Sequence, residues 1–216
     1  MNSIRVGGIV LCGGQSKRMG RSKAWLPFGG EAMLIRVLRL LGEAVGPLVV
    51  VAAPDQDLPL LPEGIAIVHD EEKGRGPLEG MAAGLAALRG QVDAAYVSSC
   101  DVPFLKPAFV RRLIELLGDQ AICVPKIGDF HHPLAAVYRL EVAETVVKLL
   151  AQNRLRPVFL FESVATRIVT ANEVVDIDPD FRTLRNLNSP EDYEAALHDV
   201  GQASGLSWTG EDAGPT

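Results

Sequence analysis

Short apolar runs that alternate with amphipathic segments are the feature that most constrains the fold of this chain. The runs are rich in valine and isoleucine and cover residues 6–11, 48–53, 65–68, 94–98, 121–124 and 134–138. Runs of this length and composition suit strands that are buried on both faces of a sheet. The segments between them carry apolar residues at helical spacing, as in Val110, Leu113 and Leu117. The repeated order of strand and helix predicts an α/β fold with a doubly wound, mostly parallel sheet.

The carboxyl-terminal third continues this pattern and then loses it. Residues 141–151 and 157–164 have helical character, residues 167–170 resemble a strand, and a further helix is expected to begin near Pro190. Ser189 is placed to cap that helix, with Asp192 in its first turn. Residues 201–216 mix glycine, serine, threonine and acids without periodicity. We therefore expect one folded domain over residues 1–200 and a disordered tail over residues 201–216.

Composition narrows the class of protein. A chain of 216 residues is long enough to bury a core without disulfides or structural metals. Its formal net charge of -6 argues against nucleic acid as a partner. No run reaches membrane-spanning length, and the apolar stretch near the start is too short for a signal peptide, so a cytoplasmic protein without a membrane partner is expected. Cys12, Cys100 and Cys123 are widely separated, which favours core residues over a zinc site.

The loop over residues 11–23 follows the first predicted strand and reads LCGGQSKRMGRSK. Gly13, Gly14 and Gly20 lack side chains and permit positive φ, so backbone N–H groups can approach phosphate oxygens. Arg18 and Lys23 can neutralise the phosphate charge. The loop also follows a strand of a doubly wound sheet, where such folds bind ligands. These features predict a cradle for the phosphates of a nucleoside triphosphate, with a solvent-exposed basic turn as the alternative.

Two common phosphate-binding motifs do not match this loop. A Walker A motif requires Ser or Thr after its lysine, whereas Ala24 follows Lys23. A dinucleotide fingerprint requires glycines in a shorter turn. The loop instead resembles that of the molybdenum cofactor guanylyltransferases, which runs Leu-Ala-Gly-Gly, then Ser, Arg-Met-Gly and Lys, with Cys12 in place of the usual alanine. This resemblance implies a Rossmann-like, glycosyltransferase-A-like three-layer sandwich, with a nucleotide-binding half near residues 1–105 and an acceptor-binding half near 106–200.

Two further segments follow the family pattern in order. One is Asp70, at the end of the run 65–69, and the other is the sequence GPLEG at residues 76–80. A helix that begins at such small residues would leave N–H groups free to face a nucleotide, although a tight turn with a helix-starting proline is the plain alternative. One expected contact is missing. Some relatives carry asparagine after the second strand, where this chain has Ala52 and Ala53.

Asp101 follows the predicted strand 94–99 and should lie at the carboxyl edge of the sheet. A buried, unpaired carboxylate is costly, so we expect a cation beside it. The family resemblance assigns Mg²⁺ to this aspartate, and Mg²⁺ takes carboxylate and phosphate oxygens together. The alternative is that Asp101 caps a helix.

The acceptor side of the resemblance rests on later residues. His132 belongs to a His-Pro segment, and Asn186 and Asn188 belong to an Asn-x-Asn-x-Pro-Glu segment. Relatives that transfer cytidylate usually carry aspartate at the position of Asn188, so the asparagine favours guanylyl transfer. Arg156, and Arg154 beside it, could grip a phosphorylated acceptor through paired hydrogen bonds. The alternative for His132 is an ordinary hairpin residue, and the alternative for Arg154 and Arg156 is a solvated helix end.

The resemblance implies transfer of GMP from GTP to the phosphate of molybdopterin, with release of pyrophosphate and with Mg²⁺ as cofactor. Arg18, Lys23 and Asp101 would be catalytic. The nucleotide-binding residues it implies are Leu11, Cys12, Gly13, Gly14, Lys23, Asp70, Gly76, Pro77, Leu78 and Asp101, and the acceptor-binding residues are His132, Arg156, Asn186 and Asn188. Transient contacts with other cofactor-biosynthesis proteins or recipient molybdoenzymes are expected.

Three alternatives remain at this point. A cytidylyltransferase of the same cofactor, or a sugar-phosphate nucleotidyltransferase, would keep the first loop and Asp101 but change the base and acceptor contacts. A catalytically silent binding protein that delivers the cofactor would have no need of Lys23 or Asp101, and this chain retains both.

Overall fold

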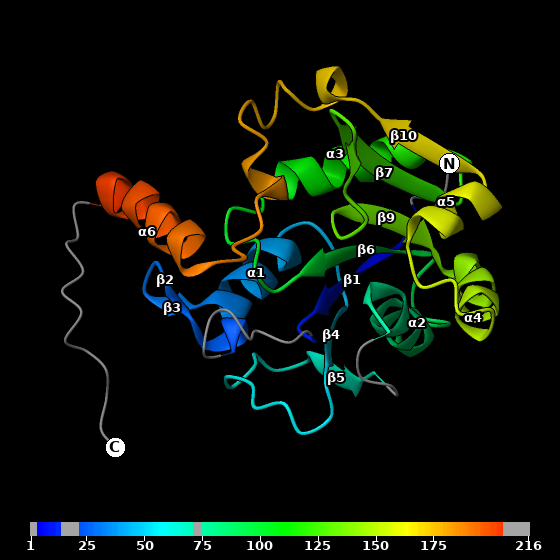
Figure 1. Cartoon of the computed structure of the whole chain (residues 1–216), viewed down its shortest axis with the longest axis horizontal. Coiled ribbons are helices and arrows are strands. Elements are labelled where there is room, and N and C mark those ends of the chain that lie inside the picture. The colour runs from blue at the N-terminus through cyan, green and yellow to red at the C-terminus, as the bar shows by residue number, and fades with distance from the viewer. Residues whose placement is uncertain (1–3, 14–21, 71–74, 205–216) are drawn as a thin grey trace.

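A computed structural model describes residues 4–13, 22–70 and 75–204 of the chain. Within these residues the structure forms one mixed sheet of eight strands and a separate two-stranded ribbon (Figure 1). The large sheet has the order β10-β7-β9-β6-β1-β4-β5, with β8 paired to β7. Its strands are β1 Val6–Leu11, β4 Leu48–Ala52, β5 Ala66–His69, β6 Ala94–Ser99, β7 Ile122–Ile127, β8 Phe130–His131, β9 Ala136–Arg139 and β10 Thr166–Val169.

The predicted mostly parallel sheet is confirmed. β1 pairs in parallel with β4 and β6, β4 with β5, and β7 with β10. β9 runs antiparallel to both of its neighbours, β6 and β7. Chain order reverses around β1, because β4 and β5 lie on one side of it and β6 on the other. This reversal is the switch point at which doubly wound sheets bind ligands.

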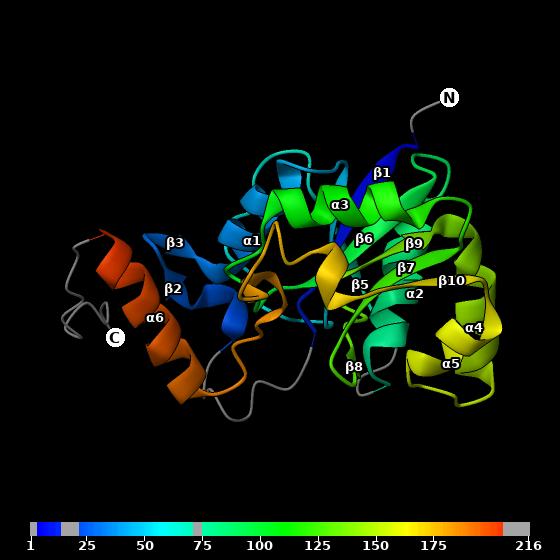
Figure 2. The same cartoon turned by 90° about the horizontal axis from the view of Figure 1, so that it is seen from above.

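Helices cover both faces of the sheet and complete a three-layer sandwich. Figure 2 shows α1 Met33–Gly42 and α3 Pro107–Leu117 on one face, and α2 Pro77–Ala87, α4 Ala143–Ala151 and α5 Val158–Ser163 on the other. Each face has its own hydrophobic cluster. The helical spacing seen in the sequence explains this packing, since α3 buries Phe109, Val110, Leu113 and Leu117 along one side.

A smaller unit lies beside the main sheet. The ribbon strands β2 Pro27–Phe28 and β3 Glu31–Ala32 pack near α6 Pro190–Ser204 in both views (Figures 1 and 2). Their shared core contains Phe28, Leu187 and Ala196. The predicted cap of α6 is confirmed, because Asp192 N–H donates to Ser189 Oγ at 3.2 Å and Ser189 N–H donates to Asp192 Oδ2 at 3.0 Å. Short 3-10 turns occur at Lys23–Trp25, Leu140–Val142, Ala171–Glu173 and Arg182–Leu184.

Several details differ from the sequence expectations. The strand predicted at 65–68 as buried on both faces forms β5 at the edge of the sheet, where the side chain of Ile67 is 47% exposed. Edge position explains the difference, because among the described strands β5 pairs with β4 alone. α6 continues through Ser204, past the residue at which the tail was expected to begin, and residues 205–216 lie outside the described part.

Two smaller expectations concern the thiols and the membrane. All three cysteines are buried and free, as core residues should be. Among the helices in the described residues, none combines the length and apolar character needed to cross a bilayer.

Close packing of α2 on β1 generates a first prediction. A Cβ added at Gly84 would lie 2.6 Å from Ile9 Cγ2, so Gly84→Ala should destabilise the fold by about 1–3 kcal/mol through overpacking. Gly42→Ala is the matched control. Its added Cβ would lie 3.6 Å from Leu48 Cδ1, an ordinary contact, so this variant should be neutral or up to about 1 kcal/mol more stable. Urea unfolding measures both values, and equal effects of the two substitutions would contradict the prediction.

Candidate active site

A cavity of about 480 Å³ opens at the carboxyl edge of the sheet, at the switch point around β1. The loops after β1, β5 and β6, the start of α2 and the segment before α6 contribute its walls. The lining residues are Leu11, Cys12, Gly13, Lys23, Val51, Asp70, Gly76, Pro77, Gly80, Ser99, Cys100, Asp101, Leu134, Asn186 and Asn188. The structure therefore brings together residues that the sequence analysis assigned to nucleotide, metal and acceptor.

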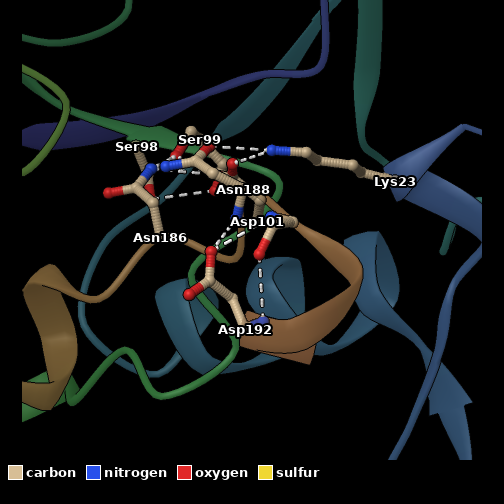
Figure 3. A network of polar contacts seen from close by, with 8 residues as sticks. Lys23, Ser98, Ser99, Asp101, Asn186, Asn188 and Asp192 are labelled. Carbon is tan, nitrogen blue, oxygen red and sulfur yellow. Dashed lines mark hydrogen bonds and ion pairs between the residues drawn. The ribbon is translucent and has the colours of Figure 1, made fainter. Parts of the chain in front are cut away.

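A buried carboxylate organises this cavity. Asp101 is only 7% exposed. Its Oδ2 accepts a hydrogen bond from Lys23 Nζ at 2.7 Å, and its Oδ1 accepts bonds from Ser99 Oγ at 2.6 Å and Asn186 Nδ2 at 2.9 Å (Figure 3). Among the described residues, Lys23 is thus the cation that pairs with the buried carboxylate of Asp101. The helix-cap alternative for Asp101 fails, because these bonds occupy the carboxylate and α3 begins only at Pro107.

The two asparagines reach the cavity from the segment before α6, which leaves the preceding 3-10 turn at Arg185 with an extended backbone. Leu187 N–H donates to Asp101 O at 3.0 Å, and the Leu187 side chain is buried in the small core. Alternation along an extended segment turns the flanking side chains the other way. Asn186 bonds Asp101, while Asn188 Oδ1 accepts from Lys23 Nζ at 3.0 Å (Figure 3). Lys23 therefore has two oxygen partners, one from the end of β6 and one from the segment before α6.

The first loop approaches Asp70 closely. A Cβ at Gly13 would lie 3.2 Å from Asp70 Oδ2, so a side chain at this position would press on the carboxylate. Asp70 N–H donates to Ala52 O at 3.2 Å, which holds the residue at the end of β5. Asp70 Oδ1 is buried and accepts no hydrogen bond from the described residues. A buried oxygen of this kind suits a donor group on a ligand.

The start of α2 forms another wall. Gly76 has φ 77° and precedes Pro77, the first residue of the helix, and no side chain among the described residues caps this end. The first N–H groups of a helix lack intrahelical partners and carry partial positive charge, which favours anions nearby. Gly76, Pro77 and Gly80 line the cavity, whereas the side chain of Leu78 is fully buried in the core.

Two cysteines that are far apart in sequence meet at the cavity floor. Cys12 and Cys100 directly follow Leu11 and Ser99, the last paired residues of β1 and β6. The hydrogen bond with Cys100 is the main cause that raises the pKa of the Cys12 thiol well above its usual value, and burial adds to it. Cys12 is therefore a neutral thiol at neutral pH, which argues against a thiolate nucleophile.

Several assigned residues do not line the cavity. His132 lies between β8 and β9, where its N–H donates to Pro125 O at 2.9 Å. Arg156 is exposed before α5. Arg154 stacks on the Phe159 ring at 4.1 Å and pairs with Glu162 at 3.8 Å, which matches the plain alternative of a solvated helix end. The predictions for Gly14 and Arg18 fall outside the described residues.

Sequence reasoning missed part of the cavity. Ser99, Cys100, Gly80, Val51 and Leu134 line it without having been assigned to it. The serine had a readable signal, since a hydroxyl at the end of an apolar strand and two residues before Asp101 is placed to bond that carboxylate. The others contribute apolar or small surfaces that only the sheet register brings to this edge.

The acidic groups suit a metal that is shared with substrate. The described residues contain no cluster of three or more His, Cys, Asp or Glu side chains able to hold a metal ion. Asp70 and Asp101 are the carboxylates among the cavity residues that the structure describes. Mg²⁺ commonly binds through one or two carboxylates together with substrate phosphates and water, so this donor set fits such an ion.

Known proteins match the sequence of this chain over most of its length. A family model described as the MobA-like NTP transferase domain matches residues 8–166. A protein of Mycobacterium tuberculosis named probable molybdenum cofactor guanylyltransferase is 37% identical over 202 residues, covering 91% of this chain and 95% of its own. A protein of the same name from Mycobacterium avium is 35% identical over 200 residues, with coverages of 90% and 96%.

Solved structures agree on the fold. Molybdopterin-guanine dinucleotide biosynthesis protein A of Archaeoglobus fulgidus superposes with a TM-score of 0.75 at 21% identity, covering 91% of this chain and 99% of that one. The 2-C-methyl-D-erythritol 4-phosphate cytidylyltransferase of Thermus thermophilus gives 0.67 at 14% identity, with coverages of 91% and 99%. The family model and the identity to the mycobacterial proteins confirm the resemblance seen in the sequence. The chain belongs to the MobA-like NTP transferases and is a nucleotidyltransferase.

Proposed function

We propose that this enzyme transfers GMP from GTP to the phosphate of molybdopterin, releasing pyrophosphate and forming the guanine dinucleotide form of the molybdenum cofactor. The observation that carries the proposal is the Lys23–Asp101 pair, 2.7 Å apart at the switch-point cavity. The names of the mycobacterial relatives, which are molybdenum cofactor guanylyltransferases, supply the acceptor and the base. The same pair weighs against a silent binding protein, which has no use for it.

The proposed reaction requires little acid–base catalysis by the protein. The acceptor phosphate is already anionic at neutral pH, so it needs no protein base to attack the α-phosphate of the nucleotide. Positioning and charge stabilisation then dominate, as in phosphoryl transfer generally. This demand matches the cavity, whose described residues include the neutral Cys12 thiol, two amides, one lysine and two carboxylates.

Each part of the cavity has a role in this scheme. Lys23 Nζ neutralises charge on the triphosphate and on the leaving pyrophosphate. The start of α2 favours the phosphates through the first backbone N–H groups of the helix, which follow Pro77 and lack intrahelical partners. Asn186 keeps the Asp101 carboxylate oriented. Arg18 shares the charge neutralisation by family resemblance, and Asp70 offers an acceptor to the nucleotide.

Asp101 is the residue that would hold Mg²⁺, together with phosphate oxygens of the substrate. When bound, the ion supplies positive charge that stabilises the phosphates in the transition state. A Mycobacterium tuberculosis protein solved in complex with manganese has the same fold, with a TM-score of 0.62 at 18% identity, covering 91% of this chain and all of that one.

Guanine is the proposed base, and cytosine is the alternative. Asn188, where cytidylyl-transferring relatives usually carry aspartate, favours GTP. We further propose that the enzyme works in the cytoplasm and that it makes transient contacts with other cofactor-biosynthesis proteins or recipient molybdoenzymes, because its product must pass to a protein that uses it.

The direct test is an assay with Mg²⁺, molybdopterin and each of the four ribonucleoside triphosphates. We expect pyrophosphate release with GTP and mass-spectrometric detection of the guanine dinucleotide product. Turnover with CTP in place of GTP would support the cytidylyl alternative. Turnover only when a sugar phosphate replaces molybdopterin would overturn the acceptor.

Removal of Asp101 tests the metal assignment. Asp101→Ala should lower Mg²⁺-dependent turnover by at least about 100-fold, because the carboxylate that holds the ion is gone. The fold should stay intact by circular dichroism, since Lys23 can still bond Asn188. Activity equal to that of the unchanged enzyme would contradict the assignment.

Removal of Lys23 tests whether its positive charge contributes to triphosphate binding. Lys23→Ala should weaken triphosphate binding by about 10- to 100-fold, the loss expected for a charge-assisted hydrogen bond of about 1.5–3 kcal/mol. Lys148→Ala is the matched control, because Lys148 is an exposed lysine on α4 that does not line the cavity. Isothermal titration with GTP measures both, and equal losses would show a non-specific charge effect.

The pKa of His132 gives a prediction for its titration midpoint. Burial lowers the pKa of His132, and the neighbouring charge of His131 lowers it further. The imidazole is therefore neutral at pH 7 and acts as a hydrogen-bonding group, not as a cation. NMR titration should place its midpoint below the usual value of about 6.5. His131→Ala should move the midpoint upward, and an unchanged midpoint in that variant would contradict the electrostatic part of this account.

A further inference from the structure

The ladder between β1 and β4 is regular until it reaches the cavity. Gly8 N–H donates to Pro47 O at 2.9 Å, and Cys12 N–H donates to Val51 O at 2.8 Å, with Leu11 paired to Val51. In a parallel ladder the residue two positions after each accepting carbonyl then donates back to the residue that gave the first bond. The next bond should therefore run from Ala53 N–H to Cys12 O.

The side chain of Gln56 takes the place of that backbone hydrogen bond. Ala53 N–H donates to Gln56 Oε1 at 3.0 Å, and Gln56 Nε2 donates to Cys12 O at 3.1 Å. The Gln56 carboxamide thus stands between two backbone groups that would otherwise meet. Both groups stay hydrogen-bonded, but the strands are held apart by the width of an amide. This separation falls where Cys12 and Val51 line the cavity.

A tight turn delivers Gln56 to this place. Gln56 N–H donates to Ala53 O at 3.1 Å, with Pro54 and Asp55 between them. Asp55 has φ 63°, which together with the proline before it is typical of a type II turn. Such a turn prefers glycine at the position of Asp55, so the backbone conformation has a cost. The turn returns the Gln56 side chain over the end of β4.

The same segment holds the other end of the first loop. Trp25 Nε1 donates to Asp57 O at 3.2 Å, and Trp25 belongs to the 3-10 turn that begins at Lys23. Gln56 therefore anchors the chain just before the glycines, and its neighbour Asp57 anchors the chain just after them. Residues 53–57 connect to both ends of the loop that the proposed function assigns to the phosphates.

We propose that Gln56 is a positioning residue for nucleotide binding: by standing in the ladder between Ala53 and Cys12 it sets the separation of Cys12 and Gly13, after β1, from Ala53, after β4. Gln56 does not line the cavity and acts through the Cys12 carbonyl and the adjacent Gly13. It supplies a carboxamide near the strand end where this chain has Ala52 and Ala53 instead of an asparagine. The proposal rests on the proposed nucleotide-binding function.

Two substitutions distinguish a spacer from a merely polar residue. Gln56→Ala removes the amide, so Ala53 and Cys12 can bond directly and the gap narrows. Gln56→Glu keeps the length and the acceptor for Ala53 N–H but places an acceptor against the Cys12 carbonyl. Protonation of that carboxyl restores an O–H donor, so the defect of Gln56→Glu should depend on pH.

GTP binding with Mg²⁺ is measured by isothermal titration at pH 7.5 and 5.5. Gln56→Ala should weaken binding by about tenfold at both pH values, the effect of about one backbone-anchoring hydrogen bond. Gln56→Glu should bind about tenfold more weakly at pH 7.5 and should recover most of this loss at pH 5.5, relative to the unchanged enzyme at each pH. In turnover, the KM for GTP should rise while kcat changes by less than about threefold.

Gln91→Ala is the matched control. Gln91 Nε2 also donates to a backbone carbonyl, Ala87 O at 2.9 Å, but on an exposed helix end away from the cavity. This variant should bind GTP as the unchanged enzyme does. Amide exchange of Ala53, followed by NMR without nucleotide, reports the inserted bond independently: it should slow in Gln56→Ala, where Ala53 N–H bonds the Cys12 backbone carbonyl in place of a side chain, and should not change in Gln91→Ala.

The outcomes separate this inference from the proposed function. If the unchanged enzyme binds GTP and both Gln56 variants bind it equally well, the positioning role is overturned while the proposed function stands. If Gln56→Glu shows no recovery at low pH, the required donor to Cys12 O is overturned. If the unchanged enzyme binds no triphosphate, the proposed function fails, and the role of Gln56 in nucleotide binding fails with it, whatever the exchange of Ala53 shows.

Discussion

The buried carboxylate of Asp101 is the constraint on which the rest of the site depends. A carboxylate removed from water is costly unless it is paired and hydrogen-bonded. Its partners come from distant parts of the chain, since Lys23 is 78 residues away and Asn186 is 85 residues away. The site therefore forms only when the first loop, the end of β6 and the segment before α6 have all reached their places. Burial of one charge thus couples the small unit that contains α6 to the main sheet.

The sheet below this charge is tightly packed, and its carboxyl edge is not. Gly84 lets α2 approach β1 so closely that an added Cβ would overlap Ile9. At the carboxyl end of β1, the backbone groups that follow the last paired residues bond to Gln56 instead of to each other. The closely packed, apolar part of the sheet thus ends at a carboxyl edge where a polar side chain holds the strands apart. This arrangement permits a cavity without leaving the partly buried backbone groups Ala53 N–H and Cys12 O unpaired.

Local signals in the sequence predicted much of this, and long-range geometry accounts for what was missed. Valine-rich runs and helical spacing identified the strands and helices, and Ser189 with Asp192 identified the start of α6, because these patterns depend on near neighbours. The exposure of β5 depends on its place at the edge of the sheet, and the reversed direction of β9 depends on its partners β6 and β7. Cys12 and Cys100 are single in sequence and meet only through the pairing of β1 with β6. The role of Gln56 likewise requires the register of β1 against β4.

The two oxygens of Asp101 are held differently, and this bears on how the site accepts a charged ligand. Oδ1 receives bonds from Ser99 and Asn186, which are neutral and fixed to the strand end and to the segment before α6. Oδ2 receives its bond from Lys23, whose four-carbon side chain is flexible and whose ammonium also contacts Asn188. A polyphosphate that attracts Lys23 therefore changes the partner of Oδ2 while the bonds to Oδ1 keep the carboxylate oriented. The neutral partners preserve the geometry, and the lysine is the group that can exchange one anion for another.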